Sequence, residues 1–300
     1  VDIENLSLDD PKTYELLQRA DTTGVFQLES RGMRDYLRQL VPNNFEDTVS
    51  MNALYRPGAL GMNMVDSYID RKHGREEVTY GHDAVKKILS TTYGVIVYQE
   101  QVMQIAQELS GFSLGQADIL RRAMGKKKKD VMDQVRDEFL KGASEKKFPA
   151  KIATKIFDLM YKFAEYGFNK SHSAAYALIS FQTAYLKSNY PLEYMASLLS
   201  SVLGNTEKAT LYITECKAMG IDVLPPCINE SDYGFVVRGK AIRFGLGAIK
   251  NVGEGAIESI IESRDGNAYE NLNDFCSNRS KRSNGFRQIH LNVLNVLNAF

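Results

Sequence analysis

Hydrophobic positions recur every three or four residues through the first two thirds of the chain, which is the spacing of amphipathic helices. Two neighbouring stretches show the pattern most clearly. The first comprises Ile152, Ile156, Phe157, Met160 and Phe163, and the second Ala175, Leu178, Ile179, Gln182, Tyr185 and Leu186. Turn-forming segments "RPGALG", "RKHGRE", "TTYG" and "SEKKFPA" interrupt the periodicity between residue 9 and about residue 204. We therefore predict a mainly α-helical region there.

The pattern changes near residue 205. A helix is predicted to end near Met219 and Gly220, and the segment after it contains six glycines and the alternating runs "FVV" and "AIRFGL", which predict short strands. We place a domain boundary near residue 205, with a helical domain over 1–204 and a smaller α+β region over 205–300. Within the helical part, the apolar run "YGVIVY" fits either a buried strand or the start of a helix, and periodicity does not separate the two.

A polar cluster, "YGFNKSHS" at residues 166–173, forms the corner between the two clearest helical patterns. Gly167 is suited to end the first helix and Ser171 to cap the second. A cation just before a helix N-terminus is unfavourable by about 0.3 to 1 kcal/mol, and an anion bound there would remove the conflict. The corner is thus either a solvated turn with a capping serine or a phosphate cradle. The cradle would use free backbone N–H groups with Lys170, Ser171, His172 and Ser173.

The strongest charge run is "LRRAMGKKKKD", which holds six cations in nine positions from Arg121 to Lys129. One interpretation is a helix end, with Gly125 just after it and cations favouring its C-terminus. The other is that adjacent arginines grip a polyphosphate while the lysines follow a nucleic-acid backbone. The residues concerned are Arg121, Arg122, Lys126, Lys127, Lys128 and Lys129.

Carboxylates show no arrangement suited to catalysis. Two-metal chemistry needs carboxylates that converge on ions about 3.5 to 4 Å apart, but the sequence contains no Asp-x-Asp. Asp66 and Asp70 share a helical face and are followed by cations, so we expect structural salt bridges there. The chain also lacks a Walker-type phosphate loop, an H-E-x-x-H pattern and an obvious nucleophile. We predict no metal site and no catalytic residue in this sequence.

The segment "IKNVGEGAIESII", residues 249–261, has the form of a helix-hairpin-helix motif. Gly253 and Gly255 would bring backbone N–H groups close to a DNA phosphate, with the hairpin near 242–265. A purely structural turn before a helix is the alternative.

Composition is that of a soluble globular protein, with 44% hydrophobic and 25% charged residues. Basic and acidic residues both number 37, so net charge points to no partner. The cysteines Cys216, Cys227 and Cys276 lack Cys-x-x-Cys spacing and are expected to be reduced thiols of a cytosolic protein. No apolar run approaches the roughly 18 residues of a membrane span. The chain opens at Val1 without a signal pattern, and we expect a fragment of a longer protein.

Several stretches together resemble the bacterial replicative DNA polymerases of family C, of the DNA polymerase III alpha-subunit type. They are "GVFQLESRGMRDYL", "ALYRPGALGMNMVDSYIDRKHGRE", "YGVIVYQEQVMQIAQELSGFSLGQADILRRAMGKKK", "FAEYGFNKSHSAAYALIS" and "YGFVVRGKAIRFGLGAIKNVGEG". The match is collinear to about residue 275 and favours the alpha-subunit type over the Gram-positive PolC type. The segment 277–300 departs from the family's basic helical pattern, which leaves a second hairpin open.

The resemblance implies a fingers domain followed by the start of a helix-hairpin-helix region. In such polymerases the catalytic aspartates and Mg²⁺ belong to a palm domain that precedes the matched part. Carried over by motif, Arg121 and Arg122 would bind the triphosphate of the incoming deoxynucleotide and neutralise charge as pyrophosphate leaves. Ser171 would belong to the same phosphate-binding element. Tyr166 would stack near the nascent base pair, Asn169 and Lys170 would hold phosphate or sugar, and His172 would lie near the sugar 2′ position.

Two functions therefore stand against each other. The first is part of a DNA-directed DNA polymerase, contributing deoxynucleotide binding and DNA grip. Its partners would be primer-template DNA, deoxynucleoside triphosphates and, through the full-length protein, a sliding clamp and other replisome subunits in the cytoplasm, with no membrane partner. The second is a free-standing, non-catalytic DNA-binding module derived from such a polymerase. A helical scaffold without nucleic-acid affinity would survive only if the basic segments bind no DNA.

Overall fold

A computed structural model describes residues 1–126, 129–164, 167–264, 268–271 and 273–275. The chain forms two compact units, Val1–Ala184 and Tyr185–Phe300. The predicted fold class, mainly α-helical with a small α+β segment, is confirmed. The predicted domain boundary near residue 205 stays a prediction.

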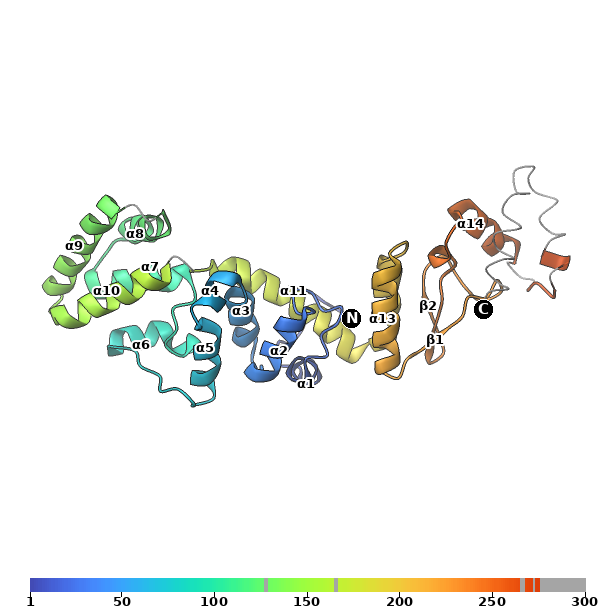
Figure 1. Cartoon of the computed structure of the whole chain (residues 1–300), viewed down its shortest axis with the longest axis horizontal. Coiled ribbons are helices and arrows are strands. Elements are labelled where there is room, and N and C mark those ends of the chain that lie inside the picture. Colours follow the sequence, from blue (N-terminus) through green and yellow to red (C-terminus); the bar gives the residue numbers. More distant parts are fainter. Residues whose placement is uncertain (127–128, 165–166, 265–267, 272, 276–300) are drawn as a thin grey trace. The chain divides into compact units, whose positions relative to one another are not determined.

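The first unit consists of helices joined by short turns (Figure 1). Their bounds are α1 (Pro11–Arg19), α2 (Arg31–Leu40), α3 (Phe45–Leu54), α4 (Pro57–Gly61), α5 (Met64–Lys72), α6 (Asp83–Leu89), η1 (Ser90–Thr92), α7 (Gln99–Ser110), α8 (Leu114–Lys126), α9 (Lys129–Glu145), α10 (Ala150–Ala164) and the larger part of α11 (Lys170–Asn189). The segment "RPGALG", predicted as a turn, contains the short helix α4. The two helices predicted around the polar corner are α10 and α11.

Local sequence explains several helix ends. Ser30 begins α2 by accepting a hydrogen bond from the Met33 N–H, and Asn44 does the same for α3. Gly111 ends α7 in the left-handed conformation, with φ of 68°. Gly125 differs from the prediction, because α8 continues through it to Lys126.

Two apolar cores fill the first unit. One lies among α1, α2, α3, α5 and α11, with Leu17, Leu37 and Phe181 completely or almost completely buried. The other lies among α6 to α10, which includes the predicted apolar face of α10. Figure 1 shows α7, α8, α9 and α10 gathered together around this second core. Burial of these large apolar side chains is the main contribution to the stability of both cores.

The run "YGVIVY" contributes side chains to both cores. Its structure decides between the two predictions for it, a buried strand and the start of a helix. Val95, Ile96 and Val97 are buried, but they belong to no helix and no sheet. Tyr98 makes an isolated parallel bridge with Phe168, and α7 begins at the next residue. The run is therefore a buried lead into a helix, with a single bridge to the corner before α11.

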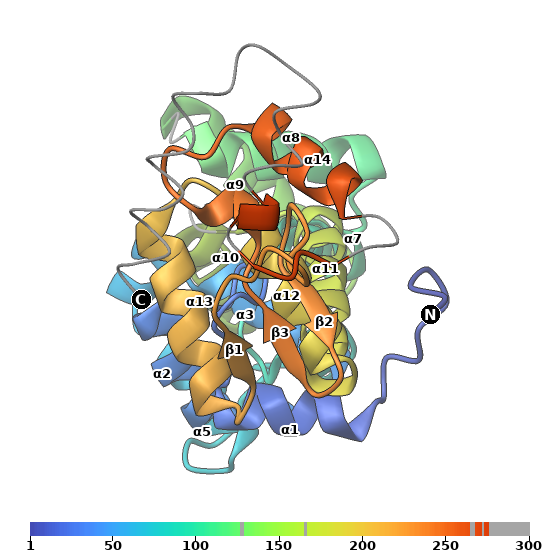
Figure 2. The ribbon, with the colours of Figure 1, turned by 90° about the vertical axis from the view of Figure 1, so that its right-hand side faces the viewer.

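The second unit contains the end of α11, then α12 (Pro191–Ser201), α13 (Thr206–Ala218), β1 (Asp222–Leu224), β2 (Val236–Arg238), β3 (Ala241–Arg243), η2 (Leu246–Ala248) and α14 (Glu254–Ser263). The predicted strands are thus present. They form one sheet in the order β1-β3-β2, in which β3 pairs parallel with β1 and antiparallel with β2 (Figure 2). Helices α12 and α13 pack against this sheet. In the described residues no helix is long and apolar enough to cross a membrane.

Candidate functional site

The first turn of α7 is the meeting point of the predicted phosphate-binding elements. Gln99 uses its backbone and both ends of its side-chain amide there. Its N–H donates to the Phe168 carbonyl at 2.9 Å, and its Nε2 donates to the Gly167 carbonyl at 3.0 Å. Its Oε1 accepts from Arg121 Nη1 of α8 at 3.1 Å. One side chain therefore connects α8 with the corner that precedes α11.

Glu100, the next residue of α7, places its side-chain carboxylate at the N-terminus of α11. Its Oε2 accepts from the Lys170 N–H at 3.0 Å, and its Oε1 accepts from Asn169 Nδ2 at 3.1 Å. An anion at this position is favoured by the helix dipole and by the charge of Lys170, and the Glu100 carboxylate is that anion. A phosphate binding at this point would have to compete with the Glu100 carboxylate.

The cap of α11 differs from the prediction. Asn169 Oδ1 accepts from the His172 N–H at 2.8 Å, so the capping residue is Asn169 and not Ser171. The position is two residues earlier because the helix starts at Lys170, which makes Asn169 the last residue outside it. Ser171 is exposed at the first turn.

Lys170 lies between acidic and aromatic partners. Its Nζ is 3.2 Å from Glu46 Oε2 and 5.3 Å from the centre of the Tyr98 ring. Tyr98 in turn shares a hydrogen bond with Ser50 at 3.1 Å, and burial raises the pKa of its phenol well above the ordinary value. The phenol therefore stays neutral and acts as a hydrogen-bonding and π partner. The Lys170 side chain itself is 38% exposed and accessible to a ligand.

An aromatic stack flanks the same helix end. The His172 ring lies 5.4 Å from that of Phe168 and 4.2 Å from that of Tyr176, centre to centre. The Arg56 guanidinium lies over the Phe168 ring at 4.7 Å, and burial lowers its pKa. His172 is thus contacted by aromatic rings on two sides and is still exposed to solvent.

The adjacent arginines of α8 share one carboxylate. Arg121 donates from Nε and Nη2 to Asp118 Oδ1 at 2.9 and 2.7 Å, and Arg122 Nη2 is 2.6 Å from Asp118 Oδ2. These hydrogen bonds, with Arg121 contributing most, lower the pKa of Asp118. Arg121 is 31% exposed and Arg122 65% exposed. Asp118 therefore holds both arginines, and Arg122 is the more exposed of the two.

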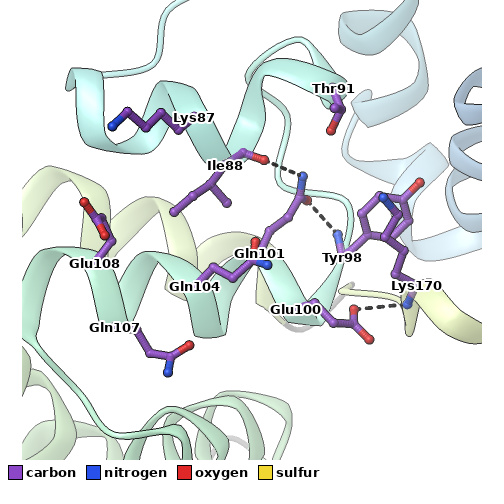
Figure 3. A pocket seen from close by; sticks show the side chains of 10 residues that line it. All are labelled: Lys87, Ile88, Thr91, Tyr98, Glu100, Gln101, Gln104, Gln107, Glu108 and Lys170. Carbon is purple, nitrogen blue, oxygen red and sulfur yellow. Dashed lines mark hydrogen bonds between the residues drawn. The ribbon is translucent and has the colours of Figure 1, made fainter.

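A polar groove of about 580 Å³ runs along the α7 face from Glu100 and Lys170 to Lys87 and Glu108 (Figure 3). The buried side chain of Gln101 forms part of its wall and accepts from the Val97 and Tyr98 N–H groups at 2.8 and 3.0 Å (Figure 3). These bonds fix the lead into α7 and so the position of Gln99. The groove follows the side of α7 on which Glu100 holds the start of α11.

The remaining predicted residues separate into three groups. Ser173 is completely buried and donates to the Val49 carbonyl at 2.6 Å, so it anchors α11 and takes no part in a phosphate cradle. Tyr166, Lys127 and Lys128 lie outside the described residues, as do the side chains of Lys126 and Lys129. The pairing predicted for Asp70 is present, with Arg75 Nε at 2.7 Å.

In the second unit Gly253 and Gly255 lie at the start of α14. Gly253 is the residue before its first turn and Gly255 belongs to that turn. A methyl group placed on either glycine would meet no described atom within 4 Å. The backbone is therefore open to close approach there, as a phosphate contact through N–H groups requires.

Sequence reasoning did not single out Gln99, Glu100, Glu46 or Asp118. The signal available was the pair "QE" directly after the buried run ending at Tyr98, which is where a helix exposes its first N–H groups. No pattern within the sequence indicates that this pair faces a segment about 70 residues later. Among the described residues, no group of three or more His, Cys, Asp or Glu side chains could hold a metal ion.

Comparison with protein families identifies both parts of the chain. Residues 1–147 match the bacterial DNA polymerase III alpha subunit finger domain, and residues 220–298 match a helix-hairpin-helix motif. Residues 1–147 are therefore similar to the finger domain of bacterial DNA polymerase III alpha subunits. The predicted resemblance, with a helix-hairpin-helix region after the fingers, is confirmed.

Particular relatives extend the match to most of the chain. It is 54% identical over 284 residues to DNA polymerase III subunit alpha of Escherichia coli (strain K12), covering 92% of this chain and 24% of that protein. It is 49% identical over 276 residues to DNA polymerase III subunit alpha of Bacillus subtilis (strain 168), covering 92% of this chain and 25% of that protein. The chain thus spans about a quarter of the length of these relatives.

Proposed function

We propose that this chain acts as the fingers and the beginning of the helix-hairpin-helix region of a replicative DNA-directed DNA polymerase. Its task there is to bind the incoming deoxynucleoside triphosphate and to grip primer-template DNA during template-directed synthesis. The observation that carries the proposal is the convergence of Arg121, Asn169 and Lys170 on the first turn of α7. The identity to polymerase alpha subunits supports it independently.

The nucleotide's triphosphate would meet the two arginines of α8 and the start of α11. A guanidinium offers a planar fork that matches two phosphate oxygens, and it keeps its charge at any physiological pH. Arg122, with most of its side chain exposed, would exchange its ion pair with Asp118 for the phosphates, while Arg121 is held in place by both Asp118 and Gln99. Lys170 and the exposed Ser171 and Asn169 would complete the phosphate and sugar contacts.

Base and sugar contacts follow from the aromatic residues of the same corner. Tyr166 would stack near the nascent base pair. His172, held between Phe168 and Tyr176, would stand near the sugar 2′ position. A ring fixed on two sides loses little side-chain freedom on binding, which favours a contact that discriminates by shape.

DNA would be held by a separate set of groups. Lys126, Lys127, Lys128 and Lys129 would follow the phosphate backbone as point charges, and the N–H groups near Gly253 and Gly255 would approach a duplex phosphate. Such contacts read no bases, because phosphates are common to every sequence. The grip would therefore position DNA without choosing a sequence.

The transfer itself would require metal-binding carboxylates from a palm domain. Mg²⁺ bound there would align the 3′ hydroxyl with the α-phosphate and stabilise the charge that develops. The residues of this chain would supply the complementary part, which is orientation and neutralisation of the triphosphate. A sliding clamp and other replisome subunits in the cytoplasm would be partners of the whole polymerase.

The test uses a chimeric polymerase, in which residues 1–275 replace the matching segment of the E. coli relative. In that enzyme Arg122→Ala should lower single-nucleotide incorporation at limiting nucleotide by about 10 to 1000 times, the scale of about 1.4 to 4 kcal/mol of lost transition-state stabilisation. Arg121→Ala should act in the same direction. Rapid-quench titration of incorporation rate against nucleotide concentration measures both.

The matched control is Arg136→Ala, which removes an arginine from α9 that pairs with Asp158 at 3.6 Å and that we assign no nucleotide contact. Its nucleotide kinetics should equal those of the parent chimera. If Arg121→Ala and Arg122→Ala both retain parental nucleotide kinetics but lose DNA affinity, the triphosphate role of α8 is wrong.

A further inference from the structure

We propose that Gln99 is a positioning residue that couples Arg121 of α8 to the start of α11, so that the two sets of phosphate-binding groups are placed as one unit. The inference rests on the function proposed above and names a residue that acts through others, because Gln99 itself is assigned no contact with the nucleotide. What it adds is a physical connection between groups that lie far apart in the sequence.

The connection is made by the two ends of one amide. The carbonyl end accepts from the Arg121 guanidinium at 3.1 Å, and the amino end donates to the Gly167 carbonyl at 3.0 Å. The backbone of Gln99 adds a third bond, from its N–H to the Phe168 carbonyl at 2.9 Å. Arg121 and the corner before α11 therefore cannot shift independently without breaking one of these bonds.

Only an amide of this length satisfies both partners. A glutamate would keep the acceptor for Arg121 but would lose the donor and set a carboxylate against a carbonyl oxygen. A lysine would offer donors to Gly167 and repel the guanidinium. A leucine of similar size would lose both bonds while keeping the helix. The chemistry at residue 99 thus matches a bridge between a cation and a carbonyl.

Two neighbouring contacts extend the bridge in opposite directions. Asp118 fixes the far side of the Arg121 guanidinium, with Nη2 to Oδ1 at 2.7 Å. Glu100, next to Gln99, holds the Lys170 N–H and the Asn169 amide at 3.0 and 3.1 Å. The first turn of α7 therefore grips both elements, and Gln99 is the residue that touches both at once.

Because Asp118 would still hold Arg121, we expect only a moderate effect of Gln99→Leu on nucleotide binding. Without Gln99, Arg121 keeps its carboxylate partner but loses its link to the corner, so its position relative to Lys170 broadens. We expect Gln99→Leu in the chimeric polymerase to raise the half-saturating nucleotide concentration by about 3 to 30 times. The maximal incorporation rate should change less than threefold, and the dissociation constant for primer-template DNA should stay the same.

A double-mutant cycle distinguishes positioning from general destabilisation. If Gln99 acts through Arg121, adding Gln99→Leu to Arg121→Ala should worsen nucleotide binding by less than twofold. Gln99→Glu, which keeps the Arg121 partner and loses the Gly167 bond, should still raise the half-saturating concentration. Gln134→Leu on α9 is the control for removing an exposed amide and should have no effect.

Each outcome has one meaning. If Arg121→Ala alone leaves nucleotide kinetics unchanged, the proposed function of α8 has failed, and the coupling with it. If Arg121→Ala impairs nucleotide binding but Gln99→Leu and Gln99→Glu do not, the coupling is wrong and the proposed function stands. Effects of Gln99→Leu and Arg121→Ala that multiply in the double variant would also overturn the coupling. Thermal unfolding of every variant identifies any that misfold, and Gln99→Glu then carries the test.

Discussion

The two surfaces assigned to ligands are built in opposite ways. Around the first turn of α7, the proposed contacts are long charged side chains, and the protein supplies their counter-charges through Asp118, Glu100 and Glu46. At the start of α14, the proposed contacts are backbone N–H groups beside Gly253 and Gly255, with no described neighbouring atom within 4 Å of an added methyl group. The first surface is thus held by internal partners and the second is defined by open space.

The difference teaches how each surface would choose its ligand. Side chains fixed by carboxylates can match the geometry of a triphosphate, but a ligand must displace or share those carboxylates, which raises specificity at some cost in affinity. Exposed N–H groups accept any phosphate that reaches them. We therefore expect the α7 surface to discriminate among nucleotides and the α14 surface to bind duplex DNA without regard to sequence.

The largest expected effect concerns catalysis, because we expect that neither the α7 surface nor the α14 surface can extend a primer. Among the residues that the structure describes, neither surface contains a cluster of carboxylates that could hold metal ions, and the sequence has no Asp-x-Asp. Positioning alone does not align and activate the reacting groups, so the isolated 300-residue chain should extend no primer. Template-dependent incorporation by the purified chain, freed of host polymerase by a tag-based and an ion-exchange step, would place an active site within it.

Neutralising the lysines should separate DNA grip from nucleotide binding. Changing Lys126, Lys127, Lys128 and Lys129 to glutamine removes up to four phosphate contacts, each of which releases roughly 0.7 to 0.9 counterion. DNA affinity should fall by about 10 to 100 times at low salt, and the slope of log affinity against log salt should flatten by about 3. Titrations at four salt concentrations by fluorescence anisotropy measure this. If the slope of log affinity against log salt is unchanged and nucleotide incorporation becomes slower, the lysines serve the nucleotide and our assignment of them to DNA is wrong.

A smaller effect is expected from filling the open space at α14. Gly255→Val adds a β-branched side chain where none is present, so a phosphate should be kept from the backbone and duplex affinity should fall by about 3 to 10 times. Gly115→Val is a matched control, because Gly115 also lies in the first turn of a helix with no described neighbour within 4 Å. Unchanged duplex affinity for Gly255→Val at low salt would make the hairpin purely structural.

The smallest effect concerns the apolar core that α12 and α13 form with the sheet of the second unit. Cys216 of α13 is completely buried, and burial raises the pKa of its thiol from 9.0 to about 11. At pH 8 its alkylation by iodoacetamide should be at least about tenfold slower than that of the partly exposed Cys227, as peptide-level mass spectrometry would show. Equal rates for the two thiols would mean that this core opens as readily as the surface.

The same raised pKa gives a pH dependence with a definite sign. Between pH 9 and about 11 the unfolded chain gains stability by releasing the thiol proton, whereas the folded chain does not. The free energy of unfolding should therefore fall as pH rises through that window and should show no contribution from Cys216 below it. Cys216→Ser, followed by urea unfolding at pH 8 and pH 10, isolates the contribution of this residue.

Periodicity and turn chemistry predicted much of the fold. The predicted helices on both sides of the polar corner are α10 and α11, and the predicted end of a helix near Met219 and Gly220 is the end of α13. The errors were local. Gly125 lies in the last turn of α8, so its preference of roughly 1 kcal/mol against a helix did not end that helix. The cap of α11 is Asn169 because the helix begins one residue before Ser171.

The sequence by itself determined the helices on both sides of the polar corner, where the basic residues cluster and which polymerase family the chain resembles, because periodicity, spacing and motifs are local or collinear properties. Only the tertiary structure decided that Gln99 bridges Arg121 and Gly167, that Glu100 occupies the α11 N-terminus and that Ser173 faces the interior. These contacts join residues tens of positions apart. Their physical origin is the packing of two apolar cores, which brings the start of α7 against α8 and the corner before α11, and no local pattern encodes that approach.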